Sequence, residues 1–323
     1  MQDLWIEKYR PEKLDDVIGQ DNIVSRLKAY VNQGYITHLL FSGSAGTGKT
    51  ACAHALCKEL YGENFEENFT EMNASDERGI DTVRYKIKEI AETMPVNASF
   101  KTIFLDEVDS LTPDAQSALR RTMEKYSENC RFILSCNYVS KLIDPIQSRC
   151  ANFTFGQLSS DKIIKQLKKI ATDNGMDTTD DGLESLVYAS KGDMRKAINY
   201  LQSIYVFDNS ITAENVFKVA PTVPIDDAKE LVDSALKGNL NDSRSYLDKM
   251  LFVNGYSGED IVDAVFQYLT SDFGIENEIL AEIFMMLQQV DFALTEGSND
   301  RIQLSGMIAK ICSLVYSKEY SNE

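Results

Sequence analysis

The first half of the chain carries two kinds of hydrophobic pattern. Short apolar runs of strand length occupy residues 38–42, 69–73, 101–105, 131–135 and 151–155. Longer stretches between them have helical spacing, as at Val83, Ile87 and Ile90, which stand at i, i+4 and i+7. This alternation predicts an α/β fold with a parallel five-stranded sheet and helices on both of its faces.

From about residue 156 onward the pattern is helical, and no further strand is predicted. Short helices are expected at 162–172, 182–189, 193–204 and 213–219. Pro221 and Pro224 then break the chain. Beyond them, one apolar stripe with the character of a helix core is formed by Ile279, Ile283, Met286, Val290 and Leu294. The sequence therefore predicts three domains: an α/β domain over 1–157, a small helical domain over 158–221 and an all-α domain over 222–323.

Composition narrows the class of protein. The 323 residues include 33 Lys and Arg against 50 Asp and Glu, which gives a net charge of −17. A generic binder of nucleic acid or of anionic membranes is usually basic, so the charge argues against both. The six cysteines and two histidines show no metal-like or disulfide-like clustering. No signal peptide or membrane-spanning run is apparent, and an intracellular protein with no membrane partner is expected.

A phosphate-binding motif follows the first predicted strand. The sequence Gly43-Ser44-Ala45-Gly46-Thr47-Gly48-Lys49-Thr50 matches G-x-x-x-x-G-K-[ST] directly before a helical pattern. Glycines allow the backbone N–H groups to point at phosphate oxygens, and the helix N-terminus adds a positive field. We expect Lys49 to meet the β- and γ-phosphates of a nucleotide and Thr50 to ligate Mg²⁺. A chance glycine-rich turn is the alternative, and the strand–turn–helix context makes it remote.

Two carboxylates end the predicted strand at 101–105. Asp106 is expected near the metal, and Glu107 can polarise the attacking water as a general base. An exposed acidic strand end would be the ordinary interpretation. The pairing with the phosphate-binding motif favours the catalytic interpretation, and an Asp-Glu pair favours hydrolysis over phosphoryl transfer to a substrate.

Two more polar residues stand near the ends of strands. Asn137 follows the run at 131–135, so it is expected at the carboxyl edge of the sheet, where it could orient the hydrolytic water. An ordinary turn asparagine is the alternative. Arg149 precedes the last strand and has the character of an arginine finger. Spacing alone leaves open whether it serves its own nucleotide or that of a neighbouring subunit.

Longer strings of the sequence resemble the AAA+ ATPases and, within them, the small subunits of replication factor C, the clamp loader of archaea and eukaryotes. The segments that carry the resemblance are residues 5–11, 14–20, 73–81 and 109–124, Ser148-Arg149-Cys150, and Gly192-Asp193-Met194-Arg195. The compact amino terminus is similar to the archaeal type. The helical tail carries no motif that matches the family, so a collar there rests on its position and on its amphipathic pattern.

The resemblance implies a nucleotide site and a set of partners. The amino-terminal segment would wrap the adenine of ATP with Tyr9, Arg10, Val17 and Ile18. Arg149 would act in trans. The helical domain at 158–221 would be the lid of the family, from which Arg195 would reach the nucleotide. The family assembles as a pentamer of several small subunits with one large subunit. This assembly opens the sliding clamp (PCNA) and encloses primer–template DNA. Its location would be the cytoplasm or nucleoid of an archaeon, or the nucleus of a eukaryote.

DNA contacts are expected at Arg78, Arg84 and Lys88. Arg84 and Lys88 stand at i and i+4, and tracking phosphates requires such a cationic face without base readout. A solvated face of local ion pairs is the alternative. Residues 1–158 hold 18 basic and 23 acidic side chains against 15 and 27 in the remainder, so most of the acidic excess lies away from this face.

Two other functions compete with clamp loading. One is a different AAA+ DNA-remodelling ATPase of the origin-recognition or branch-migration type, which usually adds a winged-helix domain. The strand-poor tail argues against this type. The other is a non-hydrolysing ATP-binding scaffold subunit of a loader, against which the presence of Lys49, Glu107 and Asn137 argues.

Overall fold

The structure is a computed structural model that describes residues 4–75, 81, 83–220, 222–271 and 274–319. The chain separates into two compact units, 1–213 and 214–323. Each unit has its own hydrophobic core.

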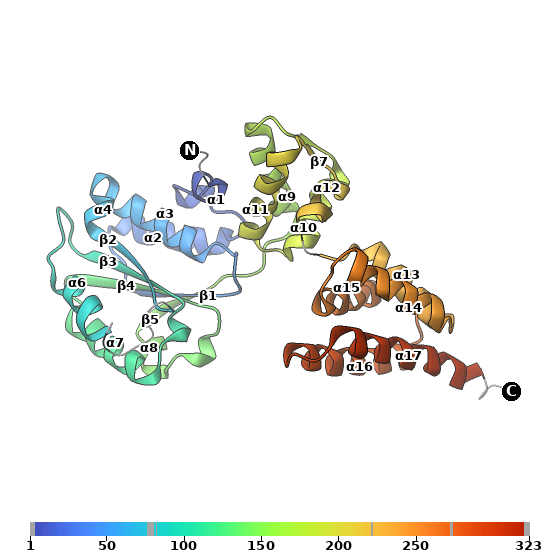
Figure 1. Ribbon diagram of the computed structural model, residues 1–323. Coiled ribbons are helices and arrows are strands. Elements are labelled where there is room, and N and C mark those ends of the chain that lie inside the picture. Colours follow the sequence, from blue (N-terminus) through green and yellow to red (C-terminus); the bar gives the residue numbers. More distant parts are fainter. Residues whose placement is uncertain (1–3, 76–80, 82, 221, 272–273, 320–323) are drawn as a thin grey trace. The chain divides into compact units, whose positions relative to one another are not determined.

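A five-stranded parallel sheet forms the centre of the first unit, with the strand order β2-β3-β4-β1-β5 (Figure 1). The strands are β1 (His38–Ser42), β2 (Phe69–Asn73), β3 (Lys101–Asp106), β4 (Cys130–Cys136) and β5 (Cys150–Thr154). Every predicted strand is confirmed, with ends that differ by at most one residue. Because β4 lies between β1 and β3, the carboxyl ends of these three strands meet at one edge of the sheet.

Helices and helical turns connect these strands. They are α1 (Trp5–Lys8), η1 (Leu14–Asp16), α2 (Asp21–Gln33), α3 (Lys49–Tyr61), η2 (Gly62–Asn64), α4 (Phe65–Asn68), η3 (Val83–Ile87), α6 (Lys88–Glu92), η4 (Val108–Ser110), α7 (Pro113–Lys125), η5 (Val139–Lys141) and α8 (Asp144–Gln147). The start of α7 shows why a helix begins where it does. Thr112 accepts a hydrogen bond from the Ala115 N–H at 3.3 Å, and Pro113 occupies the first helical position.

Both faces of the sheet are covered by helices, as the sequence predicts (Figure 1). Phe41 and Phe104 pack with residues of α2 and α3 on one face. Leu40 and Ile103, which alternate with them along the same strands, pack with residues of α7 and α8 on the other. This alternation leaves β3 and β4 almost completely buried, which holds their carboxyl ends in a rigid frame.

The residues with helical spacing at Val83, Ile87 and Ile90 are helical, but they do not form one continuous α-helix. Residues Val83–Ile87 form a π-helical turn, and only α6 continues as an α-helix. A π turn closes i→i+5 hydrogen bonds, which changes the angular relation between positions four apart. Ile87 is nevertheless buried in the core, as its apolar character predicts.

A helical subdomain completes the first unit. It consists of α9 (Ser160–Asp173), α10 (Asp180–Ser190) and α11 (Met194–Phe207), with β6 (Asp177–Thr178) and β7 (Ser210–Ile211) paired as a two-stranded parallel ribbon. The helices are confirmed, but the expectation of no strand after residue 156 is wrong. A strand of two residues is too short to carry a period-2 signal.

The second unit is helical over its described residues. Its elements are α12 (Ala213–Val219, which begins at the boundary), α13 (Ile225–Leu236), α14 (Leu240–Asp248), η6 (Lys249–Val253), α15 (Gly258–Ser271), α16 (Asn277–Thr295) and α17 (Asp300–Glu319). In the predicted stripe of α16, Ile283, Met286, Val290 and Leu294 are buried, and Ile279 packs at the edge of the same core. Among the described residues, no helix combines the length and the apolar character needed to cross a membrane.

Candidate nucleotide-binding site

The phosphate-binding motif forms the turn between β1 and α3. Gly48 has a left-handed backbone with φ of 96°, and it precedes the first residue of α3. Thr47 is buried, and its hydroxyl donates to the Ser44 carbonyl at 2.9 Å, which closes the turn. The N-terminus of α3, with its free backbone N–H groups, therefore opens toward the carboxyl edge of the sheet.

Lys49 is held at the centre of this turn. Its ammonium donates to the carbonyls of Gly43 at 2.7 Å and Ser44 at 2.9 Å, and to Asn137 Oδ1 at 3.1 Å. Burial lowers the pKa of Lys49, while the nearby Asp106 carboxylate works in the opposite direction. A buried cation whose donors reach weak neutral acceptors is well suited to an anionic ligand.

The hydroxyl of Thr50 and the carboxylate of Asp106 lie in direct contact. Thr50 Oγ1 donates to Asp106 Oδ2 at 2.9 Å, and the other oxygen, Oδ1, accepts the Glu107 N–H at 3.0 Å. Glu107 has a left-handed backbone with φ of 55°, which is unfavourable for a residue with a side chain. Strain of this kind concentrates at functional sites, and here it belongs to the residue expected to act as the base.

Asp109 fixes the loop that carries Asn137. Its Oδ2 accepts the backbone N–H groups of Asn137 at 3.3 Å and Tyr138 at 3.1 Å. These bonds connect the turn that follows β3 to the turn that follows β4. Sequence reasoning did not single out Asp109, although it stands only two residues beyond Glu107.

The amino-terminal segment lines the opposite end of the site. Tyr9 accepts a hydrogen bond from Asn174 at 2.7 Å, and Trp5 packs against Tyr205 with 5.1 Å between ring centroids. Arg10 donates to Glu7 Oε1 at 2.6 Å and lies 3.2 Å from His54 Nε2. The guanidinium of Arg10 is thus engaged with protein groups beside the pocket it also lines.

The helical subdomain approaches the phosphate-binding turn through the start of α11. The Asp193 side chain caps this helix by accepting the N–H groups of Arg195 at 2.8 Å and Lys196 at 3.1 Å. The same carboxylate lies against Gly46. Arg195 and Met194 are therefore placed at the mouth of the site, with Ile198 one turn further along the helix.

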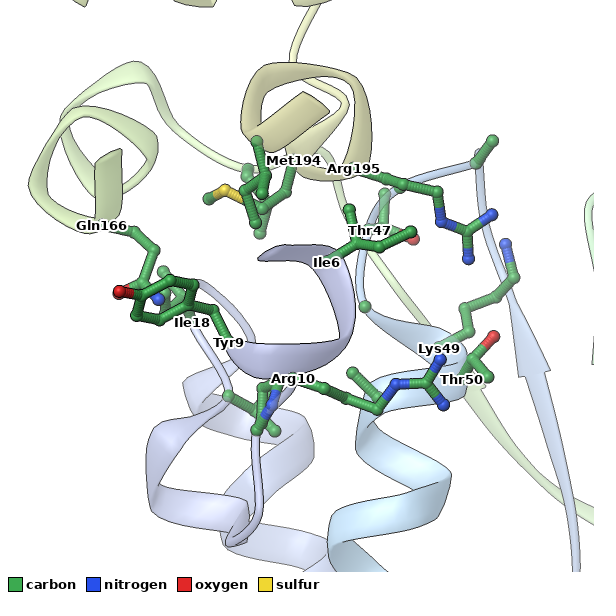
Figure 2. A pocket seen from close by; sticks show the side chains of 18 of the residues that line it. Ile6, Tyr9, Arg10, Ile18, Thr47, Lys49, Thr50, Gln166, Met194 and Arg195 are labelled. Carbon is green, nitrogen blue, oxygen red and sulfur yellow. The ribbon is translucent and has the colours of Figure 1, made fainter. Parts of the chain in front are cut away.

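These elements enclose a cavity of about 330 Å³, large enough for a small ligand. In Figure 2, Tyr9, Ile18 and Gln166 lie toward one end, and Lys49, Thr50 and Arg195 toward the other. The predicted residues that line it are Tyr9, Arg10, Val17, Ile18, Ala45, Gly46, Thr47, Gly48, Lys49, Thr50, Asp106, Glu107, Asn137 and Arg195. Those that sequence reasoning missed are Ile6, Glu7, Pro11, Ala51, Leu158, Gln166, Met194 and Ile198.

Several predicted residues lie elsewhere. Gly43 and Ser44 contribute only their carbonyls to Lys49 and do not line the cavity. Arg149 does not line it either, and its guanidinium instead contacts Glu124 and the Pro145 carbonyl.

Lys88, one of the residues expected to contact DNA, does not line the cavity. Arg78 falls outside the described residues, and Arg84 belongs to the π-helical turn η3. Lys88 is exposed and lies 3.6 Å from Glu92, so an ion pair is formed at this face.

Gln20 is a buried positioning residue that sequence reasoning did not select. Its Nε2 donates to the Thr47 carbonyl at 3.2 Å and to the Gly156 carbonyl at 2.9 Å. One side chain therefore links the phosphate-binding turn to the segment that leads from the sheet into the helical subdomain.

The donor set of the site suits a nucleotide with Mg²⁺. Among the described residues, no group of three or more His, Cys, Asp or Glu side chains could hold a metal ion by itself. Mg²⁺ commonly needs only one or two protein oxygens because phosphates and waters complete its coordination. Thr50 and Asp106 offer such a pair beside the buried Lys49 cation.

Comparison with known proteins agrees with this geometry. Residues 39–158 match the ATPase family associated with various cellular activities (AAA), and residues 223–310 match the replication factor C C-terminal domain. The replication factor C small subunit of Archaeoglobus fulgidus is 51% identical over 313 residues, which are 97% of this chain and 98% of that protein. That of Haloarcula marismortui is 48% identical over 310 residues, 96% of this chain and 95% of that protein.

Among solved structures, the RuvB Holliday junction branch migration motor of Thermotoga maritima has a similar fold. It has a TM-score of 0.56 at 19% identity, and the match covers 79% of this chain and 90% of that one. At 19% identity, this similarity shows a shared fold alone.

Together, the parallel sheet, the phosphate-binding turn and the acidic strand end define an ATPase of the AAA class. The near full-length relatives and the matching C-terminal domain narrow this class. The chain belongs to the replication factor C small subunit family, and as such it is an ATP-hydrolysing component of the clamp loader in DNA replication.

Proposed function

We propose that ATP bound with Mg²⁺ in this cavity is hydrolysed to open the sliding clamp, PCNA, and load it onto primer–template DNA. The observation that carries the proposal is the direct link between the phosphate-binding turn and the sheet edge. Lys49 contacts Asn137 at 3.1 Å, and Thr50 contacts Asp106 at 2.9 Å. The residues proposed to hold the phosphates, the metal and the attacking water therefore lie next to one another, which supports phosphoryl transfer to water as the reaction.

The residues divide the chemistry between them. Lys49 would exchange its carbonyl partners for the β- and γ-phosphates, while the N–H groups of residues 45–50 would bind phosphate oxygens. Thr50 and Asp106 would hold Mg²⁺, which supplies neutralisation of charge on the transferred phosphoryl group. Glu107 takes a proton from the attacking water, and Asn137 orients that water. Tyr9, Arg10, Val17 and Ile18 line the end of the cavity proposed for the adenine.

Two arginines would connect nucleotide state to assembly. Arg195, on α11, lines the cavity from the helical subdomain and would move with that subdomain. Arg149 is proposed to serve the nucleotide of a neighbouring subunit, since it stands outside its own cavity. Residues 1–157 would then act as the nucleotide-binding domain, 158–221 as the lid and 222–323 as the collar that joins subunits.

The partners follow from membership in the family. We propose a pentamer with a large subunit and other small subunits, acting inside an archaeal cell. Arg78, Arg84 and Lys88 are proposed to contact the DNA backbone within this assembly. The chain's net charge of −17 supports a narrow contact surface and weak DNA binding by the isolated chain.

The test is ATP turnover by the assembled complex, with and without primer–template DNA and PCNA. Wild type should be stimulated by both, and Glu107→Gln should lose on the order of 10²-fold or more in kcat while still binding nucleotide. Glu128→Gln, at an exposed glutamate outside the cavity, is the matched control and should behave as wild type. Equal turnover in Glu107→Gln and wild type would exclude Glu107 as the base. If ATP turnover is the same with and without DNA and PCNA, the proposed role in clamp loading is contradicted.

A further inference from the structure

Glu124, in the last turn of α7, binds two arginines at once. Its Oε1 accepts a hydrogen bond from Arg120 Nη1 at 3.2 Å, four residues earlier on the same helix. The same oxygen forms an ion pair with Nη2 of Arg149, which lies 25 residues further along the chain. All three side chains are at the surface, with exposed fractions between 30% and 40%.

Arg149 also donates a hydrogen bond to a second acceptor. Its Nη1 donates to the Pro145 carbonyl at 2.7 Å, from the first turn of α8. The two terminal nitrogens of the guanidinium are therefore bound to two different elements, which fixes the plane of the group. A guanidinium has five N–H donors, so several remain directed away from these contacts. A long side chain held in this way loses little further conformational entropy when it meets a ligand.

The charge of the cluster keeps Arg149 attractive to phosphate. A single carboxylate beside a single arginine would cancel the positive charge that an arginine finger needs. Here Glu124 is shared with Arg120, so two guanidiniums and one carboxylate leave a net charge of about +1, because arginine stays protonated in proteins. Arg120 thereby compensates for the carboxylate that positions Arg149.

The helix beneath the cluster is rigid. Leu119 and Met123 of α7 are fully buried against the sheet. Gln116, also buried, donates to the carbonyls of Leu111 at 3.1 Å and Lys141 at 3.0 Å. The helix starts at Pro113, shortly after Glu107. Glu124 therefore stands on a helix that is packed firmly against the sheet.

We propose that Glu124 is a positioning residue for Arg149, holding its guanidinium ready for the nucleotide of the neighbouring subunit while Arg120 preserves the positive charge. This inference rests on the proposed trans role of Arg149. An exposed ion pair contributes little to stability, so the effect of Glu124 is expected on turnover and not on folding.

The experiment measures kcat and KM for ATP in the assembled complex, with DNA and PCNA present. Glu124→Gln, which is isosteric, should lower kcat about tenfold with KM nearly unchanged, a part of the larger loss that removal of an arginine finger causes. Glu124→Asp, which keeps the charge, should recover part of the loss. Glu128→Gln is the matched control. The melting temperature of each variant should lie within about 3 °C of wild type.

A double substitution separates positioning from other effects. In an Arg149→Ala background, Glu124→Gln should lower kcat no further, because there is no guanidinium left to position. Independent, multiplicative losses would overturn the proposal, as would an unchanged kcat in Glu124→Gln when Arg149→Ala is impaired. If Arg149→Ala itself turns over ATP normally, the trans role fails, and the positioning role fails with it.

Discussion

Gly46 of the phosphate-binding turn lies so close to Asp193 of the helical subdomain that no side chain fits between them. A Cβ added at Gly46 would stand 2.0 Å from Asp193 Oδ1, and Gly46 also has a φ of 71°. The carboxylate cannot simply rotate away, because it accepts two backbone N–H groups at the start of α11. The contact therefore couples the turn that would bind phosphates to the position of Arg195, two residues further along.

We predict that Gly46→Ala destabilises the nucleotide-free protein by about 2–3 kcal/mol, the sum of a left-handed backbone and a lost helix cap. Gly48→Ala is the matched control. Gly48 also has a positive φ, of 96°, but a Cβ there would have nothing within 4 Å. Gly48→Ala should therefore be destabilised only by the cost of the left-handed backbone, about 1–2 kcal/mol.

Urea denaturation measures the free energy of unfolding of both variants. Trp5, the only tryptophan, packs against Tyr205 of the helical subdomain and serves as the fluorescent probe. Equal free energies of unfolding in the two variants would show that the contact with Asp193 is unimportant.

Asp109 provides a second prediction. Because its carboxylate binds the N–H groups of Asn137 and Tyr138, its loss should let Asn137 drift from the attacking water. A displacement of about 1 Å can cost on the order of 10²-fold in rate, so Asp109→Ala should lower kcat by about 10- to 100-fold. Nucleotide affinity should change little. Asp109→Asn, which keeps an acceptor, should fall between wild type and Asp109→Ala.

Single-turnover hydrolysis and equilibrium nucleotide binding distinguish these effects. Asp114→Ala removes another exposed carboxylate, from the first turn of α7, and serves as the control. If Asp109→Ala loses nucleotide affinity and turnover to the same extent, the substitution disrupts the whole site and does not act through the position of Asn137 alone.

Asp109 also illustrates the limit of sequence reasoning. The sheet and its polar edge were predictable because strand length, alternation and the placement of Asp106 and Asn137 at strand ends are local properties of the sequence. A side chain that binds the backbone of a loop 28 residues away leaves no periodic signal. For the same reason Gln20, which links the turn at Thr47 to Gly156, was not selected as a site residue.

Contacts made by the helical subdomain were less predictable still. The amphipathic pattern of α11 predicted the helix, but which residues face the cavity depends on how the subdomain packs on the first part of the unit. Met194 and Ile198 were therefore not selected as site residues, although both line the cavity. The π-helical turn at Val83–Ile87 was invisible because its sequence satisfies α-helical spacing equally well.

A third prediction concerns the metal. Thr50 Oγ1 contacts Asp106, so the hydroxyl is placed to share a Mg²⁺ ion with that carboxylate. Thr50→Ala should lower Mg²⁺-dependent turnover on the order of tenfold or more, and chelation by EDTA should abolish turnover in every variant. Thr50→Ser retains the hydroxyl and should stay within about threefold of wild type. Turnover is measured across a Mg²⁺ titration, and equal curves for the Ala and Ser variants would exclude Thr50 as a ligand.

The last prediction follows from His38, at the start of β1. Its Nδ1 accepts the Phe132 N–H at 3.1 Å, so this nitrogen carries no proton in the folded chain. Burial, together with the nearby Arg131, lowers the pKa of His38 from 6.5 to about 4, although a hydrogen bond to the Met123 backbone acts the other way. Between these two values the unfolded chain binds a proton that the folded chain does not. The free energy of unfolding must therefore fall as the pH drops through this window.

The free energy of unfolding is expected to fall by about 2 kcal/mol between about pH 7 and about pH 5 because of His38. This range stays above the window of Glu71, whose pKa is lowered from 4.5 mainly by its hydrogen bond to His54, so that its contribution is lost only at more acidic pH. His38→Asn supplies an amide oxygen to the Phe132 N–H and cannot titrate. The fall in its free energy of unfolding over the same pH range should therefore be about 2 kcal/mol smaller than that of wild type. Urea denaturation at constant ionic strength provides the measurement. A variant that loses as much stability as wild type would show that His38 is protonated in the folded protein or does not govern this range.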